Sequence, residues 1–141
     1  MKKNFPFYKQ PDAKDCGPTC LRIIAKHYGK TIPLQQIRNL SETTREGSSL
    51  LGLSDAAENL GFRSLGVQID FKTLVEEVPL PCIVHWNKQH FVVVYEIRVP
   101  SFGLRGKTRN SEHETRIKIS DPSYGLIEYS QEEFIKSWIG V

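Results

Sequence analysis

The spacing of apolar residues divides this chain of 141 residues into a helical first half and a strand-rich second half. Apolar residues at helical spacing predict helices over 18–28, 34–40 and 48–61. Runs rich in β-branched and aromatic residues predict strands at 62–69, 82–86, 91–97, 116–120 and 126–129. Short helices are expected at 71–78 and 131–138. Helices followed by an antiparallel sheet favour an α+β fold, with the helical first half packed on a sheet from the second half.

The composition describes an ordinary soluble domain. The length suits one core, so residues 1–141 are expected to form a single domain. A net charge of +3 with interspersed signs predicts no nucleic-acid surface. Three cysteines cannot all pair within the chain, which favours a reducing compartment. The start carries no apolar stretch of a signal peptide, and the longest apolar run, 91–95, is far too short to cross a bilayer, so a cytosolic location is expected.

Cys16 is followed by Gly17-Pro18 and then by the first predicted helix, which places its sulfur at the first helical turn. Unpaired backbone N–H groups and the positive end of the helix dipole favour a thiolate there. The thiolate is the nucleophilic form, so this position suits covalent attack on a carbonyl. Gln10, six residues earlier, is placed to donate a hydrogen bond to the oxyanion that such an attack creates.

A thiol nucleophile of this kind needs a histidine base and a group that orients the ring. Of the four histidines, His27 lies about 16 Å along the helix from Cys16 and is excluded, and His113 belongs to a polar loop. His85 lies inside a strand run. His90 follows a polar turn and begins the apolar strand, where a fixed backbone presents an exposed side chain. His90 is therefore preferred to His85 as the base.

Asp121 ends the strand at 116–120, and the proline that follows stops this strand. If this strand pairs with 91–97 as a long hairpin around the polar loop Ser101–Glu114, then His90 and Asp121 meet at the same edge of the sheet. The alternative is that residues 121–125 form a simple turn, because their residue types all favour turns. Only together with Cys16 and His90 does Asp121 become the expected ring orienter.

These residues, taken together, resemble a known family. The matching signatures are Gln10 with Asp15-Cys16-Gly17, then His90-Phe91-Val92-Val93-Val94, then Asp121-Pro122 with Gly125. By the order and spacing of these signatures, the chain resembles the C39 peptidase domain over essentially its whole length. That domain is the N-terminal domain of bacterial ABC exporters that mature and secrete bacteriocins and signalling peptides. The resemblance implies a papain-like cysteine protease fold, with Cys16 as nucleophile, His90 as general base and acid, Asp121 as orienter and Gln10 as oxyanion donor.

The same resemblance implies a cysteine endopeptidase that cuts the leader from a precursor peptide after a Gly-Gly-type pair. Two residues with little or no side chain can thread a narrow cleft that excludes bulkier ones. An amphipathic leader helix is expected to dock in an apolar groove, for which Phe5, Phe7, Tyr8 and the third predicted helix are candidates. Ordinary core packing is the alternative for each of these residues.

The implied partners are the precursor peptide and the transmembrane and ATPase domains of a parent exporter, on the cytoplasmic side of a bacterial membrane. The chain has neither the GxxxxGK[ST] phosphate loop nor a transmembrane run. It is therefore expected to be a monomeric domain excised from a homodimeric exporter, rather than a free-standing peptidase. ATP would bind only in the exporter's ATPase domain, and the peptidase domain is expected to need no cofactor.

The loop Ser101–Glu114 is longer than the family leads us to expect, and is either a contact surface or a tolerated insertion.

The other cysteines suggest no metal site. Cys20 lies one turn after Cys16, but Cys82 and the scattered histidines do not supply the remaining ligands of a four-coordinate zinc site. We therefore expect Cys20 in the core and Cys82 in the sheet.

Two further functions remain open. One is a catalytically silent domain that only binds leader or cargo, and the presence of Cys16, His90 and Asp121 disfavours it. The other is a thiol acyltransferase or amidase, because shared geometry does not fix the reaction.

Overall fold

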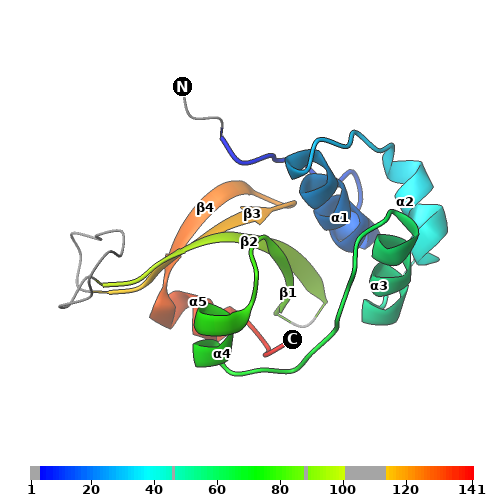
Figure 1. The fold of residues 1–141 in the computed structure, drawn as a ribbon. Coiled ribbons are helices and arrows are strands. Elements are labelled where there is room, and N and C mark those ends of the chain that lie inside the picture. The colour runs from blue at the N-terminus through cyan, green and yellow to red at the C-terminus, as the bar shows by residue number, and fades with distance from the viewer. Residues whose placement is uncertain (1–3, 46, 88, 101–113) are drawn as a thin grey trace.

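The computed structural model describes residues 4–45, 47–87, 89–100 and 114–141, and it has an α+β fold (Figure 1). A short 3-10 helix, η1 (Ala13–Asp15), leads into α1 (Cys16–His27), followed by α2 (Leu34–Ser41) and α3 (Leu50–Asn59). All three predicted helices are confirmed. Their starts follow local chemistry: Pro33 immediately precedes α2, and the Ser49 side chain caps α3 by accepting from the N–H of Gly52. Within the described ranges, no helix has the length and apolar character needed to cross a membrane.

The second half forms one antiparallel sheet in the order β1-β2-β3-β4. Its strands are β1 (Cys82–Trp86), β2 (His90–Arg98), β3 (Arg116–Asp121) and β4 (Gly125–Ser130). The predicted pairing across the polar loop is confirmed, because Val93 of β2 lies opposite Ser120 of β3. The loop at 101–113, including His113, lies outside the described residues. Two short helices, α4 (Phe71–Glu77) and α5 (Gln131–Ser137), match the predicted ones.

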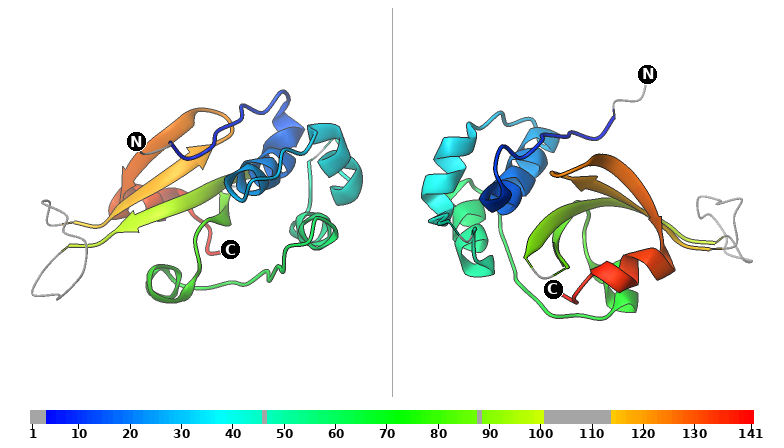
Figure 2. Two further views of the ribbon diagram at one scale, coloured as in Figure 1. Left: turned by 45° about the horizontal axis from the view of Figure 1, so that its top comes forward. Right: turned by 180° about the vertical axis from the view of Figure 1, so that it is seen from behind.

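Strand β2 is buried on both of its faces. Phe91 and Val93 belong to a core shared with α1, α2 and α3. Val92 and Val94 belong to a second core, formed with the side chains of α4, α5 and the neighbouring strands. Figure 2 shows the first three helices grouped beside the sheet and α4 and α5 on its concave side. The expected packing of the helical half on the sheet is therefore confirmed, and the two later helices cover the opposite face.

The strand predicted at 62–69 is wrong. This segment is an extended link that runs from α3 to α4 without joining the sheet (Figure 1). The outer edge of β1 is instead covered by the C-terminal residues, where the N–H of His85 donates to the carbonyl of Val141 at 2.8 Å. The link contacts this tail through Ile69, whose N–H donates to Gly140 at 2.9 Å. A strand requires a neighbour for its backbone hydrogen bonds, and residue pattern alone does not reveal which segment obtains it.

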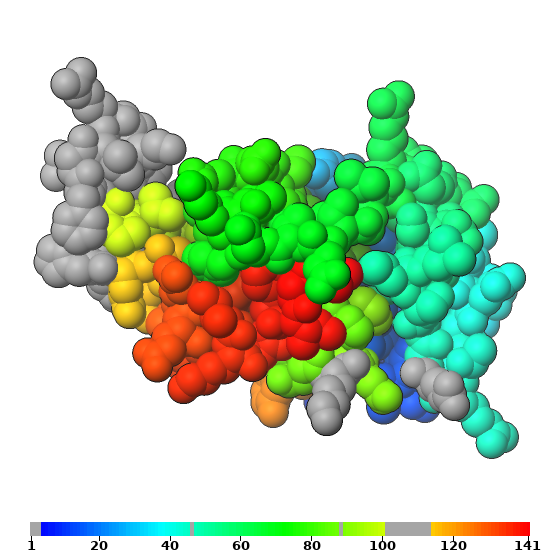
Figure 3. Space-filling view, turned by 90° about the horizontal axis from the view of Figure 1, so that it is seen from below, coloured from blue at the N-terminus to red at the C-terminus, as the bar shows by residue number. Residues whose placement is uncertain are grey.

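Helix α5 holds the centre of the second core. A capping box begins it: the Ser130 hydroxyl accepts from the N–H of Glu133, and the Glu133 carboxylate accepts from the N–H of Ser130. Figure 3 shows α5 beside α4 on this face of the molecule. The fully buried Phe134 lies between them and the sheet, with its ring centroid 5.3 Å from that of Trp86 and 5.9 Å from that of Phe71.

Phe134→Ala should lower the free energy of unfolding by about 3–5 kcal/mol, because it removes a buried ring and leaves a cavity. Urea denaturation followed by circular dichroism measures this loss. The matched control is Ile135→Ala on the same helix, where the side chain is 47% exposed and the change should stay within about 0.5 kcal/mol. Similar losses in both variants would contradict the assignment of Phe134 to the centre of this core.

Candidate active site

Cys16 is the first residue of α1, which begins two residues before the predicted start, so its sulfur lies in the first helical turn as expected. The side chain is almost completely buried. Its Sγ lies 3.8 Å from the carbonyl oxygen of Gln89, just before β2 begins. The next residue must be small, because a Cβ added at Gly17 would lie 2.9 Å from the Leu53 side chain of α3. The thiol is therefore held where the helix start meets the sheet.

An ion pair fixes the start of α1 against α2. The carboxylate of Asp15 is completely buried and accepts hydrogen bonds from Nε and Nη2 of Arg38, at 2.7 and 2.6 Å. A bidentate pair of this kind constrains both distance and orientation. The residue directly before Cys16 is thus tied to a second helix.

His90 and Asp121 meet at the end of the sheet, as hairpin topology predicted. His90 Nε2 lies 2.8 Å from Asp121 Oδ1. Side chains alternate along a strand, so His90 shares a face with Val92 and Val94, and Asp121 shares that same face with Ile119. The carboxylate is 3% exposed, whereas the imidazole is 21% exposed and remains accessible to a substrate.

The surroundings of His90 favour its charged form. Burial by itself lowers the pKa of the imidazole. The hydrogen bonds to Asp121 and Cys16, together with the charges of these groups, outweigh burial and raise the pKa from its ordinary value of 6.5 to about 9. The two groups that raise the pKa of His90 are therefore Asp121 and Cys16.

Gln10 lies beside the turn that follows Asp121. Its backbone N–H donates to the carbonyl of Pro122 at 2.9 Å, and its Oε1 accepts from Ser123 Oγ at 3.2 Å. Its Nε2 donates to the carbonyl of Asp12 at 2.9 Å. The four residues predicted for the site are therefore linked around the start of β2 and the end of β3.

Ser123 was predicted only as a turn residue, but in the structure it contacts the site. Its N–H donates to Asp121 Oδ1 at 2.8 Å, and its Oγ lies 3.5 Å from His90 Nε2 as well as contacting Gln10. A signal was present, because an aspartate commonly accepts the N–H of the residue two positions later. Nothing in the sequence placed Gln10 within reach of that hydroxyl.

The other histidines and cysteines that the structure describes occupy structural positions. The ring of His85 stacks on Phe91 at 4.8 Å, and His27 lies 5.1 Å from Phe5. Cys20 is completely buried in the helical core, and burial raises its pKa. Burial also raises the pKa of Cys82 in β1 to about 12. Among the described residues, no group of three or more His, Cys, Asp and Glu side chains is placed to hold a metal ion.

Two of the aromatic residues considered for a leader groove pack on the core. Phe5 stacks on Tyr95 with 4.3 Å between ring centroids, and the guanidinium of Arg22 lies 4.0 Å from the ring centroid of Tyr8. Both side chains also pack against the helical core. The structure therefore favours the packing alternative for Phe5 and Tyr8.

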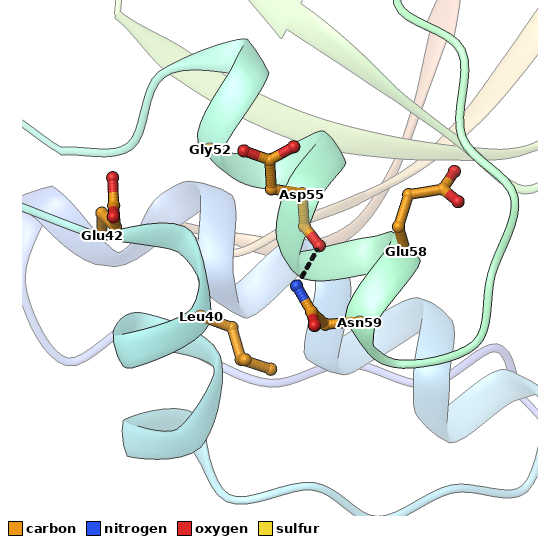
Figure 4. Close-up of a pocket in the computed structure, with 6 residues that line it drawn as sticks. All are labelled: Leu40, Glu42, Gly52, Asp55, Glu58 and Asn59. Atoms are coloured by element: carbon orange, nitrogen blue, oxygen red, sulfur yellow. Dashed lines mark hydrogen bonds between the residues drawn. The ribbon is translucent and has the colours of Figure 1, made fainter.

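A hollow of about 300 Å³ lies between α2 and α3, apart from the thiol and the imidazole (Figure 4). Acidic side chains dominate its lining, which consists of Leu40, Glu42, Gly52, Asp55, Glu58 and Asn59. Asn59 Nδ2 donates to the backbone carbonyl of Asp55 at 2.9 Å, which fixes the Asn59 side chain along α3. None of the predicted catalytic residues faces this hollow.

Comparisons with known proteins place the chain among peptidases of one family. The sequence model of the peptidase C39 family matches residues 4–105. The chain is 36% identical, over 94% of its length, to the lactococcin-G-processing and transport ATP-binding protein of Lactococcus lactis subsp. lactis. It is 30% identical, over 99% of its length, to the colicin V secretion/processing ATP-binding protein of Escherichia coli. It spans only 17% and 18% of the lengths of these two relatives.

Solved structures show the same fold. A double glycine motif protease from an AMS/PCAT transporter, crystallised with the leader peptide, has a TM-score of 0.79 and 32% identity, over 96% of this chain and 86% of that one. The peptidase domain of Streptococcus ComA, a bifunctional ABC transporter of a quorum-sensing pathway, has a TM-score of 0.76 and 32% identity, over 97% and 94% of the two chains. The α+β, papain-like fold is thereby confirmed.

The raised pKa of His90 predicts that folding stability falls with rising pH. Its contribution is complete below the unfolded value of 6.5 and is lost as pH rises through the folded value of about 9. Between pH 6 and pH 9 the loss should reach about 2 kcal/mol in the wild type and be clearly smaller in Asp121→Asn. Urea midpoints at the two pH values measure it. Equal slopes for the two proteins would show that Asp121 does not raise the pKa of His90.

Proposed function

This chain belongs to the peptidase C39 family, and we propose that it is a cysteine endopeptidase that removes the leader of a precursor peptide by cutting after a Gly-Gly-type pair. The observation that carries the proposal is the grouping of these side chains: Cys16 begins α1 next to the start of β2, and His90 Nε2 lies 2.8 Å from Asp121 Oδ1. Gln10 is held at the same turn by Ser123. A nucleophile, a proton carrier, a ring orienter and an oxyanion donor are the parts that this reaction requires.

The chemistry follows from these positions. The Cys16 thiolate attacks the carbonyl carbon of the second glycine, and the negative charge moves to the carbonyl oxygen. His90 then gives its proton to the leaving amine, the C–N bond breaks, and the leader remains attached to Cys16 as a thioester. Water, deprotonated by the now neutral His90, attacks the thioester and releases the leader acid. Asp121 keeps the ring aligned and stabilises its charged form.

Gln10 takes the part of oxyanion donor in this scheme. One of its amide hydrogens is used by the Asp12 carbonyl, so the second is the one that donates to the substrate oxygen. Ser123 holds the amide from its oxygen end. An amide fixed in this way stabilises developing charge without reorganising, which is where such donors act most strongly.

The relatives support an exporter context. The lactococcin-G and colicin V proteins are processing and ATP-binding transport proteins, and this chain matches about a sixth of their length. We infer that its partners are the precursor peptide and the transmembrane and ATPase domains of such an exporter, on the cytoplasmic side of the membrane. On its own the domain is expected to be monomeric, within a homodimeric exporter.

Cys16→Ala should abolish cleavage of a synthetic leader–core peptide with a Gly-Gly junction but preserve leader binding, because the change removes only the sulfur of one small, buried side chain. Mass spectrometry identifies the cut, and calorimetry measures binding. Cys82→Ala is the matched control, since that thiol lies in β1 away from the site and should not affect cleavage.

Each other outcome points to a different function. Binding without a cut by the wild type would favour a silent cargo-binding domain. A product joined to an added amine in place of water would favour an acyltransferase. Full cleavage by Cys16→Ala would remove Cys16 as the nucleophile.

Asp121→Asn should be milder than His90→Ala. Loss of the imidazole removes the proton carrier and should lower kcat by about 10³-fold, within the range for general acid–base groups. An asparagine oxygen still accepts from Nε2, so Asp121→Asn should cost about tenfold, and the alkaline limb of kcat/KM should move from near pH 9 to lower pH. Rate–pH profiles of the purified variants test this. Equal losses would mean that the carboxylate charge itself is essential.

A further inference from the structure

A second hollow, of about 290 Å³, opens beside the imidazole on the face of the sheet that carries α5. His90 and Asp121 line one side of it. Trp86, Tyr124, Ile127 and Tyr129 line the rest, together with shorter polar side chains. Cys16 does not line it, so the imidazole stands between the thiol and this hollow.

We infer that this hollow binds an apolar side chain from one of the first two residues of the released peptide, the part of the substrate that follows the cut. The inference rests on the proposed function. In that reaction the acyl half of the substrate becomes attached to Cys16, and its oxygen turns toward Gln10. The leaving amine receives its proton from His90 and must therefore lie at the imidazole.

The direction of the chain after the cut follows from that position. The peptide continues from the leaving nitrogen on the His90 side of the site, where the hollow opens. An extended residue spans about 3.3–3.6 Å, so the first two residues cover about 7 Å beyond the nitrogen. A side chain from either residue can enter a hollow that begins at the imidazole itself.

The lining selects the chemistry of that side chain. Trp86 is 4% exposed and packs against Tyr129, with 5.4 Å between ring centroids. Tyr124, by contrast, is 81% exposed, although the turn holds its backbone, whose N–H donates to the carbonyl of Asp121 at 3.0 Å. An exposed aromatic ring beside a buried one provides apolar area for a substrate to cover.

The charges in the lining also favour an apolar side chain. Of the described residues in the lining, only His90 and Asp121 carry charge near neutral pH, and they bind each other. An acidic side chain placed here would meet the Asp121 carboxylate and find no free cation among these residues. The occupant is therefore an uncharged apolar side chain of leucine or phenylalanine size.

Peptides that share the leader and the Gly-Gly pair, and carry Ala, Phe or Asp at the first or second position after the cut, test the inference. For the wild type we expect kcat/KM for Phe to exceed that for Ala by about tenfold at one of the two positions, with Asp below Ala. Tyr124→Ala should reduce the Phe-to-Ala ratio to about twofold, because it removes one wall of the hollow.

Tyr28→Ala is the matched control. This tyrosine is also well exposed, at 57%, but it lies at the far end of α1 and contacts His27 and Phe62. The Phe-to-Ala ratio should keep its wild-type value in this variant. A loss of preference in Tyr124→Ala but not in Tyr28→Ala would support the inference.

Two results would overturn it. One is a wild-type ratio near one at both positions, and the other is a preference that persists in Tyr124→Ala. In both cases the peptides are still cut, so the proposed function stands while the inference fails. If the wild type cuts none of the peptides, the proposed function itself is contradicted and the inference falls with it.

Discussion

The burial of β2 on both faces is the constraint on which the rest of the structure depends. Phe91 and Val93 contact the helical core, while Val92 and Val94 contact the core around α5. A strand held from both sides has little freedom to shift, so the residue that begins it is fixed as well. That residue is His90. Because α1 also packs on this strand, one apolar run determines how Cys16 approaches His90.

The position of Cys16 needs a second constraint, because packing alone lets a helix slide or rotate along its contact. Asp15 supplies it through its buried bidentate pair with Arg38. A buried carboxylate that lost this partner would be strongly destabilising, so the pair tolerates little displacement. Gly17, the residue after Cys16, permits the close approach of α1 to Leu53 of α3. Helix position, helix rotation and thiol position are thus settled by adjacent residues.

The sequence predicted those features that depend on local pattern or on one simple topology. The place of Cys16 in the first turn of α1 follows from helix signals, and the contact of His90 with Asp121 follows from pairing two neighbouring strands. The segment at 62–69 was misassigned because the edge of β1 is taken by the C-terminal tail, a choice made by tertiary contacts. Ser123 was missed for the same reason, since its partner Gln10 lies 113 positions away in sequence.

The turn from Asp121 to Gly125 carries three side chains that contact or adjoin the site. Asp121 faces the imidazole, Ser123 reaches Gln10, and Tyr124 projects toward solvent beside the same imidazole. Gly125, at a φ of +129°, lets the chain reverse directly into β4. The orientation of the His90 ring, the position of Gln10 and one wall of the hollow beside His90 therefore depend on one tight reversal. Lengthening that turn by a single residue would displace all three together, so under the proposed function it would change both the catalytic rate and the selection of the released peptide.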